Sequence, residues 1–361
     1  MCGTSATADR LLVVHEARSA ADELLGDYLR LPLGKALNLG TPGGFDRAVA
    51  LLAARLRRAT GRADGDAVRD AMAVLDVDWP RTTAAERRRL VSEAMAAAGR
   101  ATALIPARIQ VPLGDAAESV VAATRTQARR QQGLAIAADF NAFDRRVVTH
   151  VVGSQGNFVR DEYGRRVESL GEEARRIVAA GLEQGLGRDD IAADLERAAR
   201  AALVERAPFY WEVVASSFMG QGRSFAQMSS YAEAGIQRYV IEAVLDERTT
   251  HICRYLHGKS FAVADALQRF ERVEQLEQPE DIKRELPWVR ESLDPETGRT
   301  RLYVDGGAGR TPLAEVTRSA FGTRDDRGDF RALASDGALR EVGIGFPPYH
   351  GLCRTTTLAV A

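Results

Sequence analysis

The chain contains little cysteine, histidine or aromatic residue. Its 361 residues include 3 Cys and 5 His, and aromatic residues make up 6%. Three cysteines cannot form the dense disulfide framework of small secreted domains. Alanine and arginine are abundant, and this composition favours helices over a large sheet.

The chain also lacks a net charge and long apolar runs. Its 49 basic residues nearly balance 50 acidic ones, for a net charge of −1, so no global field attracts nucleic acid. No run of 18 apolar residues is long enough to span a membrane, and the N-terminus has no signal-peptide pattern. We therefore expect a protein without membrane segments, made in a reducing cytoplasm.

Helical periodicity dominates the first two thirds of the sequence. Apolar spacing predicts helices over 8–30, 45–59, 65–75 and 83–104, and Thr83 with Glu86 fits a capping box at the start of the last of these. Two prolines in "LIPARIQVPLG", residues 104–114, predict a break. We place a boundary near residue 110, between an N-terminal helical region of unknown role (1–110) and a helical middle region (111–235).

The pattern changes after Gly235. Strands are predicted at 236–245, 259–263, 299–304 and 354–360, with a turn at 294–299 and one charged helix at 264–286. The predicted fold is therefore mostly α with a C-terminal α+β domain. This domain covers residues 236–361 and includes a charged insertion at about 264–345.

Several arginines gather in the middle region: Arg125, Arg129, Arg130, Arg145 and Arg146. A basic helix face of this kind can contact DNA phosphates, although a solvated face with nearby carboxylates is the simpler interpretation. His150 lies alone in an apolar run and is interpreted as a core residue.

The rare residue types concentrate in two short stretches, "DERTTHICRYLHGKSF" at 246–261 and "PPYHGLCRTTTLAV" at 347–360. The first holds Cys253 and His257, and the second holds His350 and Cys353. Two ligand pairs far apart in sequence are the usual source of tetrahedral zinc sites. The spacing thus makes zinc a possible cofactor.

Three other interpretations of these residues stay open. A cysteine beside a histidine can be an activated nucleophile. Cys253 and Cys353 can form a disulfide, or the group can be a buried polar clasp. In every case we expect the two stretches to be adjacent, with the strand before Asp246 and the strand after Arg354 in one sheet.

Neighbouring residues explain how such a clasp would be built. Asp246 can pair with Arg354, and Thr249 is expected to cap the turn or helix that carries Cys253. Gly258 permits a sharp turn before the strand that contains Phe261. Pro348 belongs to a Pro-Pro pair, which is expected to keep the chain extended just before His350.

Together these positions form a two-part motif. The chain resembles the phage Mu F-like head-morphogenesis family, roughly over residues 175–361, at Asp246, Arg248, Thr249, Cys253, Gly258, Phe261, Pro348, His350, Cys353 and Arg354.

The resemblance implies a structural protein with no catalytic residues. It would be a minor head protein of a phage, prophage or phage-derived particle, located in the virion, with portal or other capsid proteins as partners. Its role would lie in head morphogenesis or in DNA packaging or ejection. Two alternatives stay open: a Cys/His enzyme or toxin, with or without zinc, and a cytoplasmic interaction module derived from a prophage.

Overall fold

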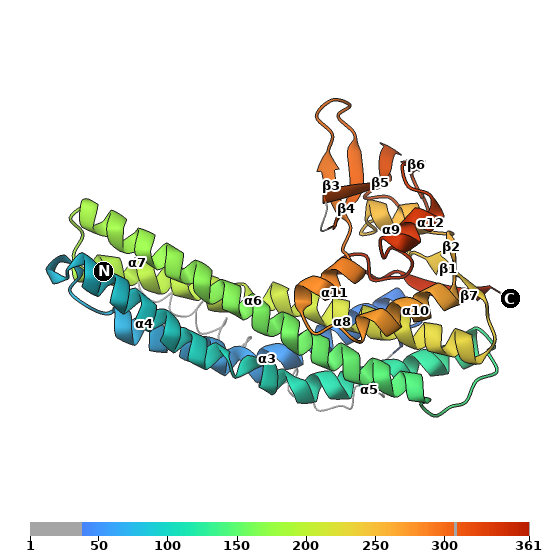
Figure 1. Ribbon diagram of the computed structural model, residues 1–361, viewed down its shortest axis with the longest axis horizontal. Coiled ribbons are helices and arrows are strands. Elements are labelled where there is room, and N and C mark those ends of the chain that lie inside the picture. Colours follow the sequence, from blue (N-terminus) through green and yellow to red (C-terminus); the bar gives the residue numbers. More distant parts are fainter. Residues whose placement is uncertain (1–37, 307–308, 361) are drawn as a thin grey trace, which may run out of the picture.

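The computed structural model describes residues 38–306 and 309–360. Within them the chain forms a long body of helices and a smaller α+β domain at one end of it (Figure 1). The helix predicted over 8–30 lies outside the described residues. The expected class, mostly α with a C-terminal α+β domain, is confirmed.

The helical body comprises residues 42–233, and its longest helices run along the long axis of the molecule (Figure 1). Its elements are α3 (Pro42–Leu75), η1 (Trp79–Arg81), α4 (Ala84–Thr102), α5 (Ile105–Gln131), α6 (Ala142–Glu183), α7 (Arg188–Arg200), η2 (Ala201–Glu205) and α8 (Ala207–Glu233).

Side-chain caps mark two of the helix starts. The capping box of Thr83 and Glu86 is confirmed at the start of α4, and Asn141 with Asp144 forms a second one at α6. The prediction of separate helices at 45–59 and 65–75 is wrong, because α3 is continuous across both. The apolar face continues through the junction at buried Ala63, so burial outweighs the low helix propensity of the glycines beside it.

The predicted break at residues 104–114 is also wrong. Helix α5 passes through it, with Pro106 in the first turn, where no N–H is needed. Pro112 lies inside the helix, but Ile105, Ile109 and Leu113 are fully buried and hold the segment in place. Position 110 therefore falls within a helix, and its flanks share one hydrophobic core.

The described residues contain two hydrophobic cores. The larger one joins the helical body to the α+β domain and includes Trp211, Phe225, Tyr239, Phe270 and Phe346. The smaller one, which includes Trp79, lies among α3, α4, α6 and α7, away from the α+β domain. The shared larger core fixes the α+β domain to the body.

A three-stranded antiparallel sheet in the order β2-β1-β7 carries the two motif stretches. Its strands are β1 (Arg238–Glu242), β2 (Ser260–Ala262) and β7 (Thr356–Val360), and Val240 pairs with Leu358. The prediction that the strand before Asp246 and the strand after Arg354 share a sheet is confirmed.

The described part of the region between β2 and β7 adds three helices and a second sheet to the α+β domain. It contains α10 (Val263–Val273), α11 (Pro279–Glu285), β3 (Arg290–Leu293), β4 (Thr300–Gly306), β5 (Gly309–Arg318), β6 (Asp329–Ala332) and α12 (Asp336–Glu341). Strands β3 to β6 form a four-stranded sheet in chain order.

The sequence predicted one turn and one helix in this region, and only the turn is confirmed. The turn predicted at 294–299 does join β3 to β4, and Asp294 accepts backbone bonds within it. The single helix predicted over 264–286 is wrong, because the chain forms α10 and α11 and Pro279 begins the second helix. Strands β5 and β6 were not predicted.

Helix α8 positions the last strand. Arg223 donates to the carbonyl oxygens of Arg354 and Thr355, at 3.1 and 2.7 Å. Tyr231 donates to the carbonyl of Thr357 at 2.9 Å. The helix thus holds both the body core and the approach to β7.

Among residues 38–306 and 309–360, no helix is both long and apolar enough to cross a bilayer.

Candidate functional site

The first motif stretch begins with a tight turn after β1. The Asp246 carboxylate accepts from the backbone N–H of Arg248 and from the hydroxyl of Thr249. The Thr249 hydroxyl also accepts from the backbone N–H of Asp246. Of the two roles expected for Thr249, capping the turn is confirmed and capping the helix is not, because Thr250 occupies the N-cap position. Thr249 closes the turn instead.

Helix α9 (His251–Leu256) follows this turn and carries Cys253. The helix is short, and Ile252, Cys253 and Leu256 face the protein interior. After it, Gly258 adopts φ = +79°, a left-handed conformation that favours glycine. The chain then enters β2, where the Phe261 ring lies 6.3 Å from that of Tyr239, so the expected sharp turn is confirmed.

The second stretch is the loop that leads into β7. The Pro347–Pro348 peptide bond is cis, and Pro348 lies close to Gly220 of α8. The buried Tyr349 comes next, followed by His350 and then Cys353, which is 1% exposed.

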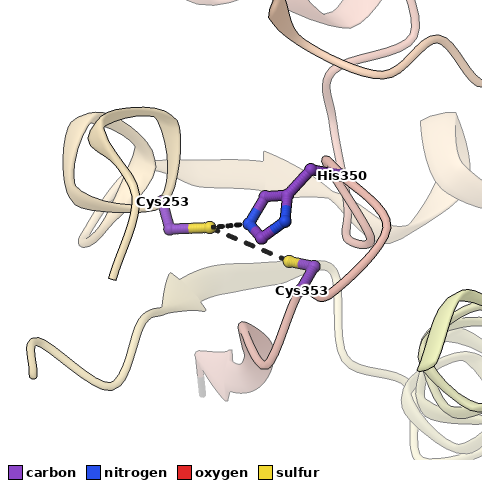
Figure 2. Close-up of side chains that lie close together, drawn as sticks. All are labelled: Cys253, His350 and Cys353. Carbon is purple, nitrogen blue, oxygen red and sulfur yellow. Dashed lines mark hydrogen bonds between the residues drawn. The ribbon is translucent and has the colours of Figure 1, made fainter. Parts of the chain in front are cut away.

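The two stretches bring Cys253, His350 and Cys353 together (Figure 2). The Sγ atom of Cys253 lies 3.3 Å from Nε2 of His350 and 3.8 Å from Sγ of Cys353. One donor atom from each residue lies within 4.8 Å of the other two. The predicted adjacency is therefore confirmed.

The two cysteines are free thiols in this arrangement. A covalent S–S bond needs about 2.05 Å, and the sulfurs are 3.8 Å apart. The backbone nevertheless places the two sulfur atoms close to each other and to His350. The site is thus a compact Cys/Cys/His cluster, and we use the name thiol–imidazole cluster for Cys253, His350 and Cys353.

His257 does not belong to this cluster, so the four-ligand set that includes it is wrong. Its Nδ1 accepts a hydrogen bond from the backbone N–H of Ala243 at 3.2 Å. The residue is the C-cap of α9, where the chain already turns away toward β2. His251 likewise has other partners, Glu291 and Ser319.

Burial and mutual contacts shift the pKa values of the three side chains in different directions. The hydrogen bond to Cys353, together with burial, raises the pKa of Cys253 well above its usual value. Burial alone would raise the pKa of Cys353, but the hydrogen bond from Cys253 and the charge of His350 lower it well below that value. Burial would lower the pKa of His350, and the Cys353 thiolate raises it. Both shifts favour negative charge on Cys353 beside positive charge on His350.

The predicted ion pair between Asp246 and Arg354 is confirmed. An Arg354 Nη2–H donates to Oδ1 of Asp246 at 2.5 Å, and the side chains are 10% and 22% exposed. Burial would raise the pKa of Asp246, but the bonds from Arg354 and Thr249 lower it to about 2. Arg248 points elsewhere and pairs with Asp46 of α3 at 3.0 Å.

Sequence reasoning missed Arg254, which is fully buried. Its guanidinium donates to the backbone carbonyls of Thr249 and Asp246, at 3.0 and 2.6 Å, and also to those of Thr323 and Asp326. It therefore joins the motif turn to the segment between β5 and β6. An arginine within the otherwise apolar "HICRYL" was the available signal.

A small cavity of about 20 Å³ adjoins the cluster. Its lining includes Thr250, Cys253, His350, Arg354 and Thr355. A cavity of this size holds about one water molecule.

The proposed basic helix face is only partly available. Arg125 is buried and pairs with Asp144 and Glu233 at 2.8 and 2.7 Å, so its part in the DNA prediction is wrong. Arg146 pairs with Glu274. Arg129, Arg130 and Arg145 are exposed.

His150 is a core residue, as predicted. It is 9% exposed, and its ring packs edge-on against Phe225 and Phe270. Burial lowers its pKa to about 4.

These features define a class: a helical body that carries an α+β domain closed by an Asp–Arg pair and a thiol–imidazole cluster. Residues 172–280 match the family model described as Phage Mu protein F like protein. Over these residues the chain is similar to the phage Mu F-like proteins, a family related to phage heads. The match runs from the end of α6 to the start of α11, so it includes Cys253 but ends before His350 and Cys353. No curated protein and no solved structure matches the chain.

Proposed function

We propose that this protein is a minor head protein of a phage, prophage or phage-derived particle, located in the virion next to the portal. Its role lies in head morphogenesis or in DNA packaging or ejection. The match of residues 172–280 to a family of structural phage head proteins carries this proposal. The matched segment contains α8, which holds both the body core and β7. The protein would present its α+β domain rigidly at one end of a long helical body, a suitable form for bridging two particle components.

Exposed apolar side chains beside the motif suggest where a partner binds. Trp288 is 46% exposed and Phe321 is 59% exposed. Phe321 packs against His251, whose Nδ1 lies 3.0 Å from Glu291 of β3. Aromatic side chains are enriched at protein–protein interfaces. We therefore expect a portal or other capsid protein to contact this face. The exposed Arg129 and Arg130 would contact DNA, if DNA passes the body.

Co-assembly tests the proposal. The chain would be expressed with the portal and major capsid proteins encoded beside it, and the purified particles would be analysed by quantitative mass spectrometry. We expect a few copies per particle and a loss of incorporation in Phe321→Asp. Phe209→Asp is the matched control, because Phe209 is 65% exposed on the helical body. A folded wild-type chain that is absent from the particles would refute the proposal and favour the free interaction module.

A Cys/His enzyme or toxin is the second candidate, and the lowered pKa of Cys353 beside His350 favours it. A nucleophile must reach its substrate, whereas Cys353 is 1% exposed and the adjoining cavity is about 20 Å³. Alkylation by iodoacetamide separates the two functions. A structural thiol reacts only after denaturant is added, while a catalytic Cys353 reacts rapidly in the native protein.

A further inference from the structure

We propose that Cys253, His350 and Cys353 bind one zinc ion in a tetrahedral site whose fourth ligand is a water molecule. The site does not depend on the proposed role in the head, because it is inferred from the geometry and chemistry of the three side chains alone.

The distances between the donor atoms match a tetrahedral metal. Two thiolates bonded to zinc at about 2.3 Å, with a tetrahedral angle between them, lie about 3.8 Å apart. The sulfurs of Cys253 and Cys353 are 3.8 Å apart. With a Zn–N bond of about 2.05 Å, the expected S···N separation is about 3.6 Å. The distance from Cys253 Sγ to His350 Nε2 is 3.3 Å, so this pair needs a shift of only a few tenths of an ångström, and all three donor atoms lie within 4.8 Å of one another.

The donor set selects the metal. Thiolate sulfur and imidazole nitrogen are ligands of zinc, whereas magnesium and calcium prefer oxygen. Two thiolates also neutralise the charge of a divalent cation. A neutral site suits the location, because Cys253 and Cys353 are 3% and 1% exposed and an unbalanced charge there would be costly.

The fourth position faces the small cavity. This cavity is lined by Cys253 and His350 and has about 20 Å³, enough for one water. The Thr250 hydroxyl lies 3.1 Å from Nε2 of His350 and also lines the cavity, so it can hydrogen-bond that water. His257 is held by Ala243 and does not supply the fourth ligand.

The site would have a structural effect. Cys253 lies on α9, after β1, while His350 and Cys353 lie in the loop before β7. A metal bound there cross-links segments about 100 residues apart, and such ligands come together only in the folded chain.

Metal analysis tests the site directly. The full chain, prepared without a polyhistidine tag or added metal, would be analysed for zinc by mass spectrometry. We expect about one zinc per chain in the wild type and in the control His257→Ala, and less than about a tenth of that in Cys253→Ser and Cys353→Ser. A folded, metal-free wild type that takes up no added zinc overturns the proposal. Loss of zinc in His257→Ala overturns the ligand set.

A second measurement uses the wild type and so avoids variants that fail to fold. Zinc would be removed with a chelator and replaced by Co²⁺. Two thiolates in a tetrahedral site should give near-ultraviolet charge-transfer absorption and strong visible bands, which disappear when zinc is added back. Only the weak spectrum of hydrated cobalt would overturn the site.

Discussion

Replacing Asp246 by Asn should destabilise the α+β domain by about 2 kcal/mol at pH 7. Burial would raise the pKa of Asp246, but the interactions with Arg354, together with the hydrogen bonds from Thr249 and the Arg248 backbone, lower it from 3.8 to about 2, and each pH unit of such a difference corresponds to about 1.4 kcal/mol. The side chains are 22% and 10% exposed. The pair should therefore contribute more than a surface ion pair, at about 0.2–1 kcal/mol, and less than a fully buried one.

A double-mutant cycle isolates the interaction. Asp246→Asn, Arg354→Met and the double variant should show a coupling energy of about 1.5–2 kcal/mol. Asp46→Asn is the matched control, because Asp46 lies 3.9 Å from Arg354 and pairs mainly with the exposed Arg248. Its effect should stay below about 1 kcal/mol.

Hydrogen exchange of the β1 and β7 amides measures the opening of this sheet without assuming that the whole chain unfolds in one step. The pH dependence supplies an independent check. Because the folded-state pKa of Asp246 is lowered, its contribution is complete above about pH 4 and is lost as the pH falls toward 2. Asp246→Asn should lack this loss. Purely additive effects of Asp246→Asn and Arg354→Met would refute the reasoning.

Two further predictions concern buried positions away from this pair. Because burial lowers the pKa of His150 from 6.5 to about 4, the unfolded chain binds the extra proton between these values, and His150 should contribute a loss of about 3 kcal/mol of stability as the pH drops through that window. Burial raises the pKa of Asp64 to about 6 and so contributes with the opposite sign; the measurement is therefore the difference between urea titrations of the wild type and of His150→Leu, and equal slopes would contradict the buried neutral state. Gly343→Ala should lower the free energy of unfolding by more than about 2 kcal/mol, and the melting temperature with it, because Gly343 has φ = +90° and an added Cβ would lie 2.4 Å from the carbonyl oxygen of Glu285. Gly337→Ala in α12 is the control and should be neutral or slightly stabilising, because a Cβ added there would lie 3.8 Å from its nearest neighbour. Equal shifts in melting temperature for the two variants would contradict this prediction.

Local patterns in the sequence predicted what local interactions determine. The capping box at Thr83 depends on residues three apart, and the strand pattern around Val240 depends on alternating side chains. The concentration of rare residues correctly indicated one site. The partner of Asp246 was also predictable, because Asp246 follows the first strand, Arg354 precedes the last one, and these two strands pair.

Long-range packing decided the features that sequence reasoning missed. Burial of Ile109 and Leu113 keeps α5 helical through Pro112, although proline disfavours a helix interior. Arg125 looks like its basic neighbours in sequence, but the folded chain buries it against Asp144 and Glu233. Such outcomes depend on contacts that no local window contains.

The thiol–imidazole cluster was likewise determined in part by the sequence and in part by the tertiary structure. The sequence by itself determined which side chains were candidates, since structural zinc sites are built from Cys and His. Only the tertiary structure chose His350 over His257, because the pairing of β1 with β7 and the bonds from α8 bring the loop before β7 against α9. His257, four residues beyond Cys253, instead ends α9 and bonds the backbone of Ala243. A nearby residue in sequence was excluded and one 97 residues away was included, because the direction of a side chain is set by the packing of the whole domain.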